Sequence, residues 1–193
     1  MKRLIGTALA LAALVAVSAC TNKQGETESP VFITVAIPNQ PGFIDVSVPA
    51  PVQLETMNLV SHLKSPTASD PQHFADVNLS SYRVTFRRTD GGTAVPAPQT
   101  FGGAGLVPSG GTLTLNNFPI MSASSIQASP LDQLLPFNGG IDRETGRSEI
   151  DTAFDVVFFG ETVSGHRVES EPGSGILIFR NGPAAGVAGR AGK

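Results

Sequence analysis

Residues 82–88 read Tyr-Arg-Val-Thr-Phe-Arg-Arg, and this short stretch decides the fold. Tyr82, Val84 and Phe86 occupy every second position, and polar side chains stand between them. A period of two is typical of a β-strand that buries one face against a core and leaves the other face in water. Asp90-Gly91-Gly92 follows and predicts a turn.

Similar patterns recur on both sides of this strand. Apolar runs or alternations cover residues 31–37, 44–48, 52–59, 113–115, 150–159, 166–170 and 176–179. Residues 150–159 are apolar on both faces, so we expect that strand to be central and covered. The 21 glycines and 15 prolines interrupt nearly every helical window, and the best remaining turn of helix is residues 130–135.

Seven or eight short strands separated by turns predict an all-β fold, an antiparallel β-sandwich over residues 30–181. The alternative is a small lipocalin-like barrel. The two differ in the surroundings of four aromatic side chains. A sandwich packs them into a closed core, whereas a carrier barrel lines a pocket of several hundred cubic ångströms with them. These side chains are Tyr82, Phe86, Phe154 and Phe158.

The beginning of the chain has the pattern of a secretory signal peptide. Lys2 and Arg3 give it a positive start, and residues 4–17 form an apolar run. That run is too short to span about 30 Å of hydrocarbon comfortably as a helix.

Val17-Ser18-Ala19-Cys20 resembles the lipobox of bacterial lipoproteins. In that family the signal peptide is cut before the cysteine, which then carries lipid such as palmitate on its sulfur and on its new amino group. The resemblance implies a membrane anchor at Cys20, the only cysteine of the chain. In this family, Asp directly after the cysteine tends to keep the protein in the inner membrane. Thr21 stands at that position here, so the resemblance favours the outer membrane where a cell has two. The alternative is an ordinary secreted protein, because Val17 and Ala19 also suit the general signal peptidase.

The chain therefore divides into four predicted segments. Residues 1–19 are the signal peptide, and residues 20–29 are a polar, flexible, lipidated tether. Residues 30–181 form the β-sandwich domain. Residues 182–193 are rich in glycine and alanine without periodicity, so we expect a disordered tail.

Two further resemblances concern the domain. Residues 154–179 resemble the closing strands of immunoglobulin-like or fibronectin-type domains, although the cysteine and tryptophan marks of immunoglobulin domains are absent. Residues 90–96 and 137–147 resemble stretches of uncharacterised bacterial envelope lipoproteins, which imply no known activity.

Composition argues against two classes of partner. The net charge is −3 and becomes more negative when Lys2 and Arg3 are removed, so the chain has no general attraction for nucleic acid. The chain has no Trp and only one Tyr, Tyr82. That composition disfavours carbohydrate binding, which usually needs exposed aromatic rings.

Catalytic and cofactor motifs are absent from the sequence. The three histidines, His62, His73 and His166, are not at metal-ligand spacing, and no Gly-x-Ser-x-Gly elbow is present. Residues 101–111 are glycine-rich but lack the lysine of a phosphate-binding loop, and we interpret them as a mobile connection. The sequence therefore predicts no enzyme and no cofactor.

The best candidate for a small-cation site is an acidic stretch around Gly146. Arg143 and Arg147 lie within it, which favours a solvated turn with local ion pairs over a metal site. The weak candidate ligands are Asp142, Glu144, Glu149 and Asp151.

A possible partner surface is formed by Arg83, Arg87 and Arg88, which we expect opposite the core. The competing interpretation is a solvated face that guards against edge-to-edge strand pairing. Together these features predict a lipid-anchored protein of the cell envelope, on the periplasmic face of the outer membrane or on the cell surface. Its non-catalytic β-sandwich would serve structure or interaction with an envelope protein. The alternative is a small-ligand carrier or enzyme on a barrel scaffold.

Overall fold

The structure, a computed structural model, describes residues 28–65 and 67–182. The predicted signal peptide, Cys20, residues 20–27 of the predicted tether and residues 183–193 of the predicted tail lie outside these ranges. Ser29, which we assigned to the tether, already belongs to the domain, because its buried hydroxyl donates to the carbonyl of Val31 at 2.9 Å.

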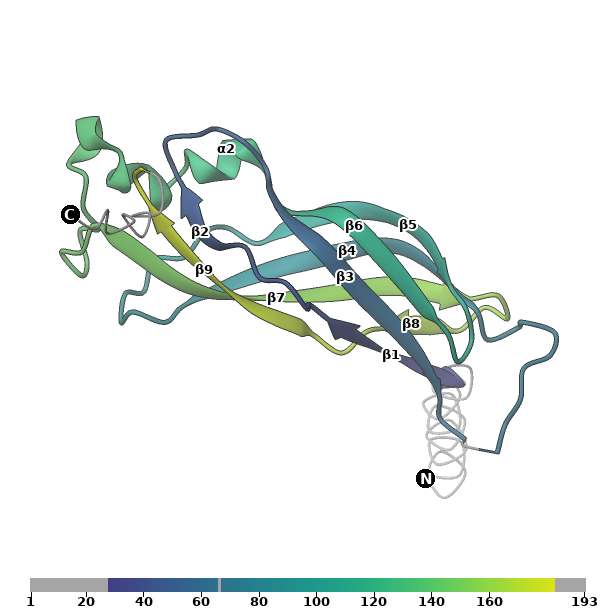
Figure 1. Cartoon of the computed structure of the whole chain (residues 1–193). Coiled ribbons are helices and arrows are strands. Elements are labelled where there is room, and N and C mark those ends of the chain that lie inside the picture. Colours follow the sequence, from purple (N-terminus) through teal and green to yellow (C-terminus); the bar gives the residue numbers. More distant parts are fainter. Residues whose placement is uncertain (1–27, 66, 183–193) are drawn as a thin grey trace, which may run out of the picture.

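Nine strands in the described ranges form two sheets that pack as a sandwich (Figure 1). The first sheet has the order β1-β3-β6, with β1 (Val31–Ala36), β3 (Val52–Leu63) and β6 (Thr112–Met121). The second has the order β2-β9-β7-β4-β5, with β8 also paired to β7. Its members are β2 (Gly42–Asp45), β9 (Gly173–Arg180), β7 (Glu149–Thr162), β4 (Val77–Arg88), β5 (Gln99–Val107) and β8 (Arg167–Glu169).

The predicted all-β sandwich is confirmed, and the two sheets do not join into a closed barrel. Two details of the prediction are wrong. The described residues contain nine strands instead of seven or eight, and β2 runs parallel to β9 although every other pairing among them is antiparallel. Residues 101–111 are also no mobile connection, because most of them belong to β5 and to the turn into β6.

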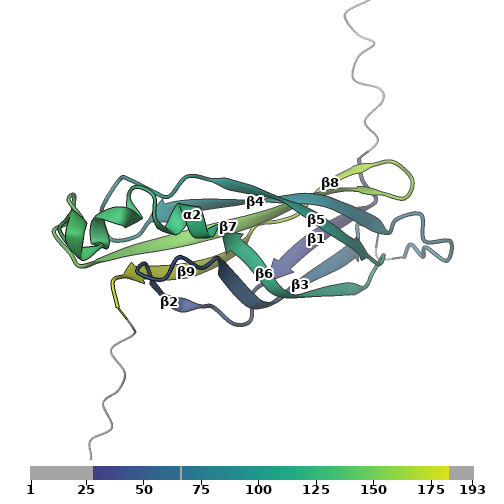
Figure 2. The same cartoon turned by 90° about the horizontal axis from the view of Figure 1, so that it is seen from above.

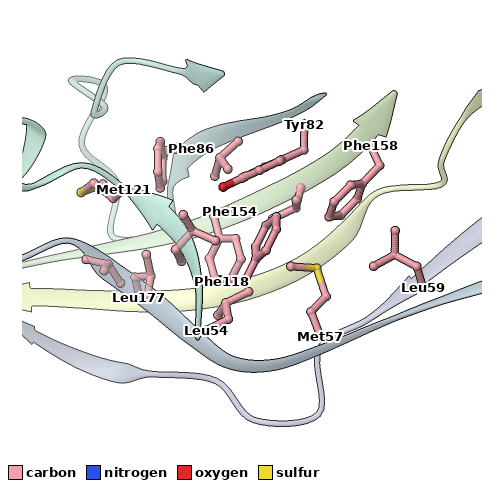
Figure 3. Packing of buried hydrophobic residues seen from close by; sticks show 14 of the residues in the cluster. Leu54, Met57, Leu59, Tyr82, Phe86, Phe118, Met121, Phe154, Phe158 and Leu177 are labelled. Carbon is pink, nitrogen blue, oxygen red and sulfur yellow. The ribbon is translucent and has the colours of Figure 1, made fainter. Parts of the chain in front are cut away.

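Aromatic rings fill the space between the sheets (Figure 3). Tyr82, Phe86, Phe154 and Phe158 are each at most 8% exposed, as a sandwich requires. Phe118 of β6 reaches across from the first sheet, with its ring centroid 4.1 Å from that of Tyr82. The Tyr82 hydroxyl also crosses, donating to the Pro119 carbonyl at 2.7 Å. Burial raises the pKa of this phenol above its usual range, so the hydroxyl keeps its proton and the cross-sheet bond.

β7 is the central strand, as predicted. It pairs with β4 along one side and with β9 and β8 along the other. Gly175 of β9 lies directly over Phe154, where a Cβ atom would stand 2.5 Å from the ring. Glycine is therefore required there by the close approach of β9 to the core ring.

In the part of the chain that the structure describes, short helices occur only between β6 and β7. They are α2 (Ala123–Ile126), η1 (Leu131–Leu134) and η2 (Pro136–Asn138), and η1 confirms the helical turn predicted at residues 130–135. The strand predicted over residues 44–48 is shorter, because β2 ends at Asp45. The Asp45 carboxylate accepts the N–H of Ser47 at 2.9 Å and turns the chain there.

The two ends of the sandwich carry different loops (Figures 1 and 2). The N-terminal end, as we call it, holds residues 28–30, the β3–β4 loop (residues 64–76) and the β7–β8 turn (residues 163–166). The opposite end, called the C-terminal end, holds the β4–β5 loop (residues 89–98) and the β6–β7 connection (residues 122–148). None of the helices in the described ranges has the length and apolar character needed to cross a membrane.

Candidate functional site: a buried arginine network at the C-terminal end

Arg88 ends β4 with its side chain turned inward. It stands at even spacing from Tyr82 and Phe86, which point into the core, whereas Arg83 and Arg87 belong to the outer face. The Arg88 side chain is 2% exposed and the Arg87 side chain 64%. The prediction that Arg88 belongs to a surface basic face is therefore wrong, and the period of two along β4 already contained the signal.

The guanidinium of Arg88 is shared between two carboxylates whose side chains are fully buried. Its Nε and Nη2 donate to the two oxygens of Asp90 at 2.7 and 2.8 Å. Nη2 also donates to Asp142 at 2.7 Å, and Nη1 donates to the carbonyl of Ala94 at 3.1 Å. Because two acids face one base, the buried cluster carries an excess negative charge that other donors must balance.

Backbone amides and neutral side chains supply those donors to Asp142. Gln133 donates its amide to one carboxylate oxygen at 2.7 Å, and the Thr145 hydroxyl donates to the other at 2.6 Å. The Gln133 carbonyl accepts the N–H of Arg143 at 3.0 Å. Asp142 and Gln133 thus connect η1 to the turn at residues 142–146, and each side-chain oxygen and nitrogen of the two residues has a hydrogen-bond partner.

Asp90 is balanced in the same way. It accepts the N–H of Asp151 at 3.0 Å and the N–H of Gly92 at 3.2 Å. Burial alone raises the pKa of Asp90, but the hydrogen bonds from Arg88 and from these two amides outweigh burial and lower the pKa to about 2. The Asp142 pKa is also lowered, because the bonds from Arg88 and Thr145 outweigh burial.

Gly92 gives the guanidinium room. A Cβ atom at this position would lie 2.4 Å from the central guanidinium carbon of Arg88. The Asp90-Gly91-Gly92 motif is therefore more than a turn signal, since its last glycine lets the β4–β5 loop fold directly over Arg88.

Glu144 ties the two loops of the C-terminal end together. Its carboxylate accepts the hydroxyl of Thr93 at 2.7 Å and the N–H of Ala94 at 3.0 Å. Both residues lie in the β4–β5 loop, about 50 residues earlier in the chain. Hydrogen bonds from Thr93 and Ala94 lower the pKa of Glu144, so it stays ionised.

The acidic stretch predicted as a weak cation site is divided between two arginines. Asp142 and Glu144 face Arg88, at 2.7 and 4.0 Å. Arg147 pairs with Glu149 and, at 2.9 Å, with Asp151, which is the local ion pairing that the sequence favoured. Within residues 28–65 and 67–182, no group of three or more His, Cys, Asp or Glu side chains is placed to hold a metal ion.

The network supports two exposed apolar side chains, Phe137 and Ile141, which we call the C-terminal tip. Phe137 is 82% exposed and Ile141 is 47% exposed. Leu134 and Leu135, just before them, are buried, and the Leu135 carbonyl accepts the N–H groups of Asn138 at 2.9 Å and Gly140 at 3.1 Å. The C-terminal tip therefore stands on a hydrogen-bonded and packed base.

Arg83 and Arg87 do lie on the outer face of β4, as predicted. Arg83 lies over the ring of Phe159, 5.4 Å from its centroid, and Arg87 is 4.0 Å from Asp155. The explanation that they guard a sheet edge is wrong, because β4 lies between β5 and β7. Their role as a partner surface stays a prediction.

Other polar sites are less developed. His73 and Ser109 both contact Asp76. The His73 ring is 3.3 Å from the carboxylate, and Ser109 donates its backbone N–H to it at 2.7 Å. The Ser109 hydroxyl does not take part, so these residues do not form a serine–histidine–aspartate triad. A groove of about 670 Å³ crosses β4, β7 and β8 on the outer surface, and its lining includes Phe159 and Arg167.

Comparisons with protein-family models, curated proteins and solved structures found no match for this chain. The functional argument therefore depends on geometry. At the C-terminal end that geometry consists of one buried cation shared by two buried carboxylates, further hydrogen-bond donors to those carboxylates, and loops held in fixed positions.

We expect Arg88→Met to lower the free energy of unfolding by about 3–5 kcal/mol, because it leaves Asp90 and Asp142 buried without their cation. Urea denaturation measures the loss. The matched control, Arg87→Met, removes an exposed arginine from the adjacent position and should change stability by less than about 0.5 kcal/mol. Adding Asp90→Asn and Asp142→Asn to Arg88→Met should recover part of the loss, and equal stability of the two single variants would contradict this account.

Stability should also fall in acid. The pKa of Asp90 is about 2 in the folded protein and about 4 when unfolded, so its contribution is complete above the unfolded pKa and disappears as the pH falls toward 2. This shift corresponds to about 2 kcal/mol. Between about pH 5 and pH 2, Asp90→Asn should therefore lose about 2 kcal/mol less stability than the unmodified chain. Parallel pH profiles of the two proteins would argue against the low pKa.

Proposed function

We propose that this chain is a membrane-anchored envelope lipoprotein whose non-catalytic β-sandwich presents the C-terminal tip to a protein partner. The observation that carries the proposal is the placement of the two ends. The chain enters the domain at one end, and the β6–β7 connection lies at the other (Figures 1 and 2). That connection carries Phe137 and Ile141, and the arginine network holds it in place.

The lipobox supports the anchor. Pro30, whose carbonyl accepts the N–H of Lys64 at 2.9 Å, is only ten residues beyond Cys20. Ten extended residues reach at most about 35 Å. Lipid on Cys20 would therefore keep the N-terminal end close to the membrane, while the C-terminal tip lies at the opposite end of the domain. The outer membrane, on its periplasmic face or at the cell surface, is the location we propose.

The fold that we propose is immunoglobulin-like. With β1, β3, β4, β5, β6, β7 and β9 as strands A, B, C, C′, E, F and G, the sheet orders become A-B-E and C′-C-F-G. Immunoglobulin domains distribute these strands between their two sheets in the same way. β2 and β8 are additions, and the short turn at residues 108–111 joins β5 directly to β6, so strand D is absent from the described residues.

Protein interaction fits the C-terminal tip better than catalysis or ligand carriage. Within the described residues, Tyr82, Phe118 and Phe158 fill the space between the sheets that a carrier would leave open for its ligand, and the two sheets do not close into a barrel. Exposed aromatic anchors are the residues that dominate binding energy in protein interfaces. A base fixed before binding also reduces the entropy lost on association.

Lipidation is tested by growing cells with radiolabelled palmitate. We expect the label in the wild-type protein and its complete loss in Cys20→Ser, because no other thiol is present. Thr21→Ser is the control and should keep the label. Label retained by Cys20→Ser, or a bare thiol at the first residue of the mature protein by mass spectrometry, would remove the anchor from this proposal.

The partner is tested by a photo-crosslinking amino acid placed at Ile141 of the full chain in intact cells. We expect a discrete adduct that disappears when Phe137→Ala is added, because the aromatic anchor is lost. The control position is Ile176, which is 52% exposed on the outer face of β9 and should give no such adduct. Adducts of equal pattern and yield from both positions would contradict a partner specific for the C-terminal tip.

A further inference from the structure

The N-terminal end also exposes apolar side chains. Phe74 in the β3–β4 loop is 54% exposed, and Val163 in the β7–β8 turn is 52% exposed. The two loops are joined by backbone hydrogen bonds, from the N–H of Ser164 to the carbonyl of Phe74 at 3.0 Å and from the N–H of Val163 to that of Asp76 at 2.9 Å. We call Phe74 and Val163 the N-terminal pair.

The exposure of Phe74 is not the result of a loose loop. The Asp70 carboxylate accepts the N–H groups of Phe74 at 3.0 Å and Ala75 at 2.8 Å, and Ala75 itself is buried. Asp76 is also buried and accepts the N–H of Ser109 at 2.7 Å. The backbone on both sides of the ring is therefore fixed while the ring itself stays in water.

The turn that carries Val163 is fixed as well. Thr162 is buried, its N–H donates to the carbonyl of His166 at 2.8 Å, and its own carbonyl accepts the N–H of Gly165 at 2.9 Å. Two separate loops thus carry exposed apolar side chains. Both loops lie at the end where the chain enters the domain (Figure 1). Exposed apolar side chains on a fixed backbone are typical of a surface that is covered in use.

The position of the N-terminal pair identifies its occupant. The β3 strand that precedes the Phe74 loop ends beside Pro30, and Pro30 is ten residues from Cys20. With lipid on Cys20, a bilayer surface lies within about 35 Å of this end at all times. A tether of this length gives a second, weak contact a millimolar effective concentration, so a pair of side chains is sufficient.

We propose, building on the lipid anchor proposed above, that Phe74 and Val163 insert into the headgroup region of the bilayer that holds Cys20. Aromatic and aliphatic side chains at the boundary of headgroups and acyl chains are favourable there, whereas in water they are not. The contact gives the domain a second attachment and a defined orientation, with β1 and β3 rising from the membrane and the C-terminal tip facing outward.

The natural chain has no Trp, so a single Trp reports on one position. Phe74→Trp, Val163→Trp and the matched control Phe137→Trp are prepared as mature, lipidated full-length chains in phosphatidylcholine vesicles, with and without bromine on the acyl chains. We expect bromine to quench Trp at 74 and 163 and the emission of both to shift to shorter wavelength relative to detergent. Trp at 137 should show neither change.

Equal quenching at 74 and 137, or none at 74 and 163, overturns the inference. If Phe74→Trp does not fold, Val163→Trp decides alone. The intact mass of each sample separates this inference from the proposed function. Lipid present on Cys20 together with unquenched reporters leaves the lipoprotein proposal standing and rejects the membrane contact, whereas a bare Cys20 rejects both.

Discussion

One guanidinium determines the arrangement of the C-terminal end. The buried Arg88 side chain stands at the end of β4. It binds Asp90 in the loop that follows and Asp142 in the connection before β7. Burying such a cluster costs desolvation energy that its attraction only partly offsets, so an apolar cluster of the same size would stabilise the domain as well. We infer that the network serves to fix the β4–β5 loop relative to the β6–β7 connection, because a planar, bidentate arginine between two carboxylates admits few alternative loop arrangements.

The packed core links the position of the C-terminal end rigidly to that of the N-terminal end. Tyr82, Phe118 and Phe158 interlock across the two sheets, and the Tyr82 hydroxyl bonds to the first sheet at Pro119. Close-packed interiors transmit orientation because their side chains cannot slide independently. Fixing the N-terminal end would therefore also fix the direction of the C-terminal tip.

The sequence predicted what depends on local periodicity and missed what depends on distant partners. Alternation over residues 82–88 and the apolar run over residues 150–159 predicted the central strands correctly. β5 was missed because its three glycines, Gly102, Gly103 and Gly105, provide no alternating side chains. Arg88 was grouped with its arginine neighbours although its parity placed it inside, and its partner Asp142 is 54 residues away, beyond any local pattern.

Carboxylates that accept backbone N–H groups hold the loops at both ends of the domain. With one cysteine the chain cannot form an internal disulfide, so its loops must be held by packing and polar bonds. At the N-terminal end Asp70 and Asp76 accept backbone N–H groups around Phe74, and at the C-terminal end Asp142 does so beside the C-terminal tip. Hydrogen bonds from backbone amides to ionised carboxylates are among the stronger hydrogen bonds in proteins. In each case a loop fixed by a carboxylate carries an exposed phenylalanine, and the fixed backbone keeps that ring at a set position.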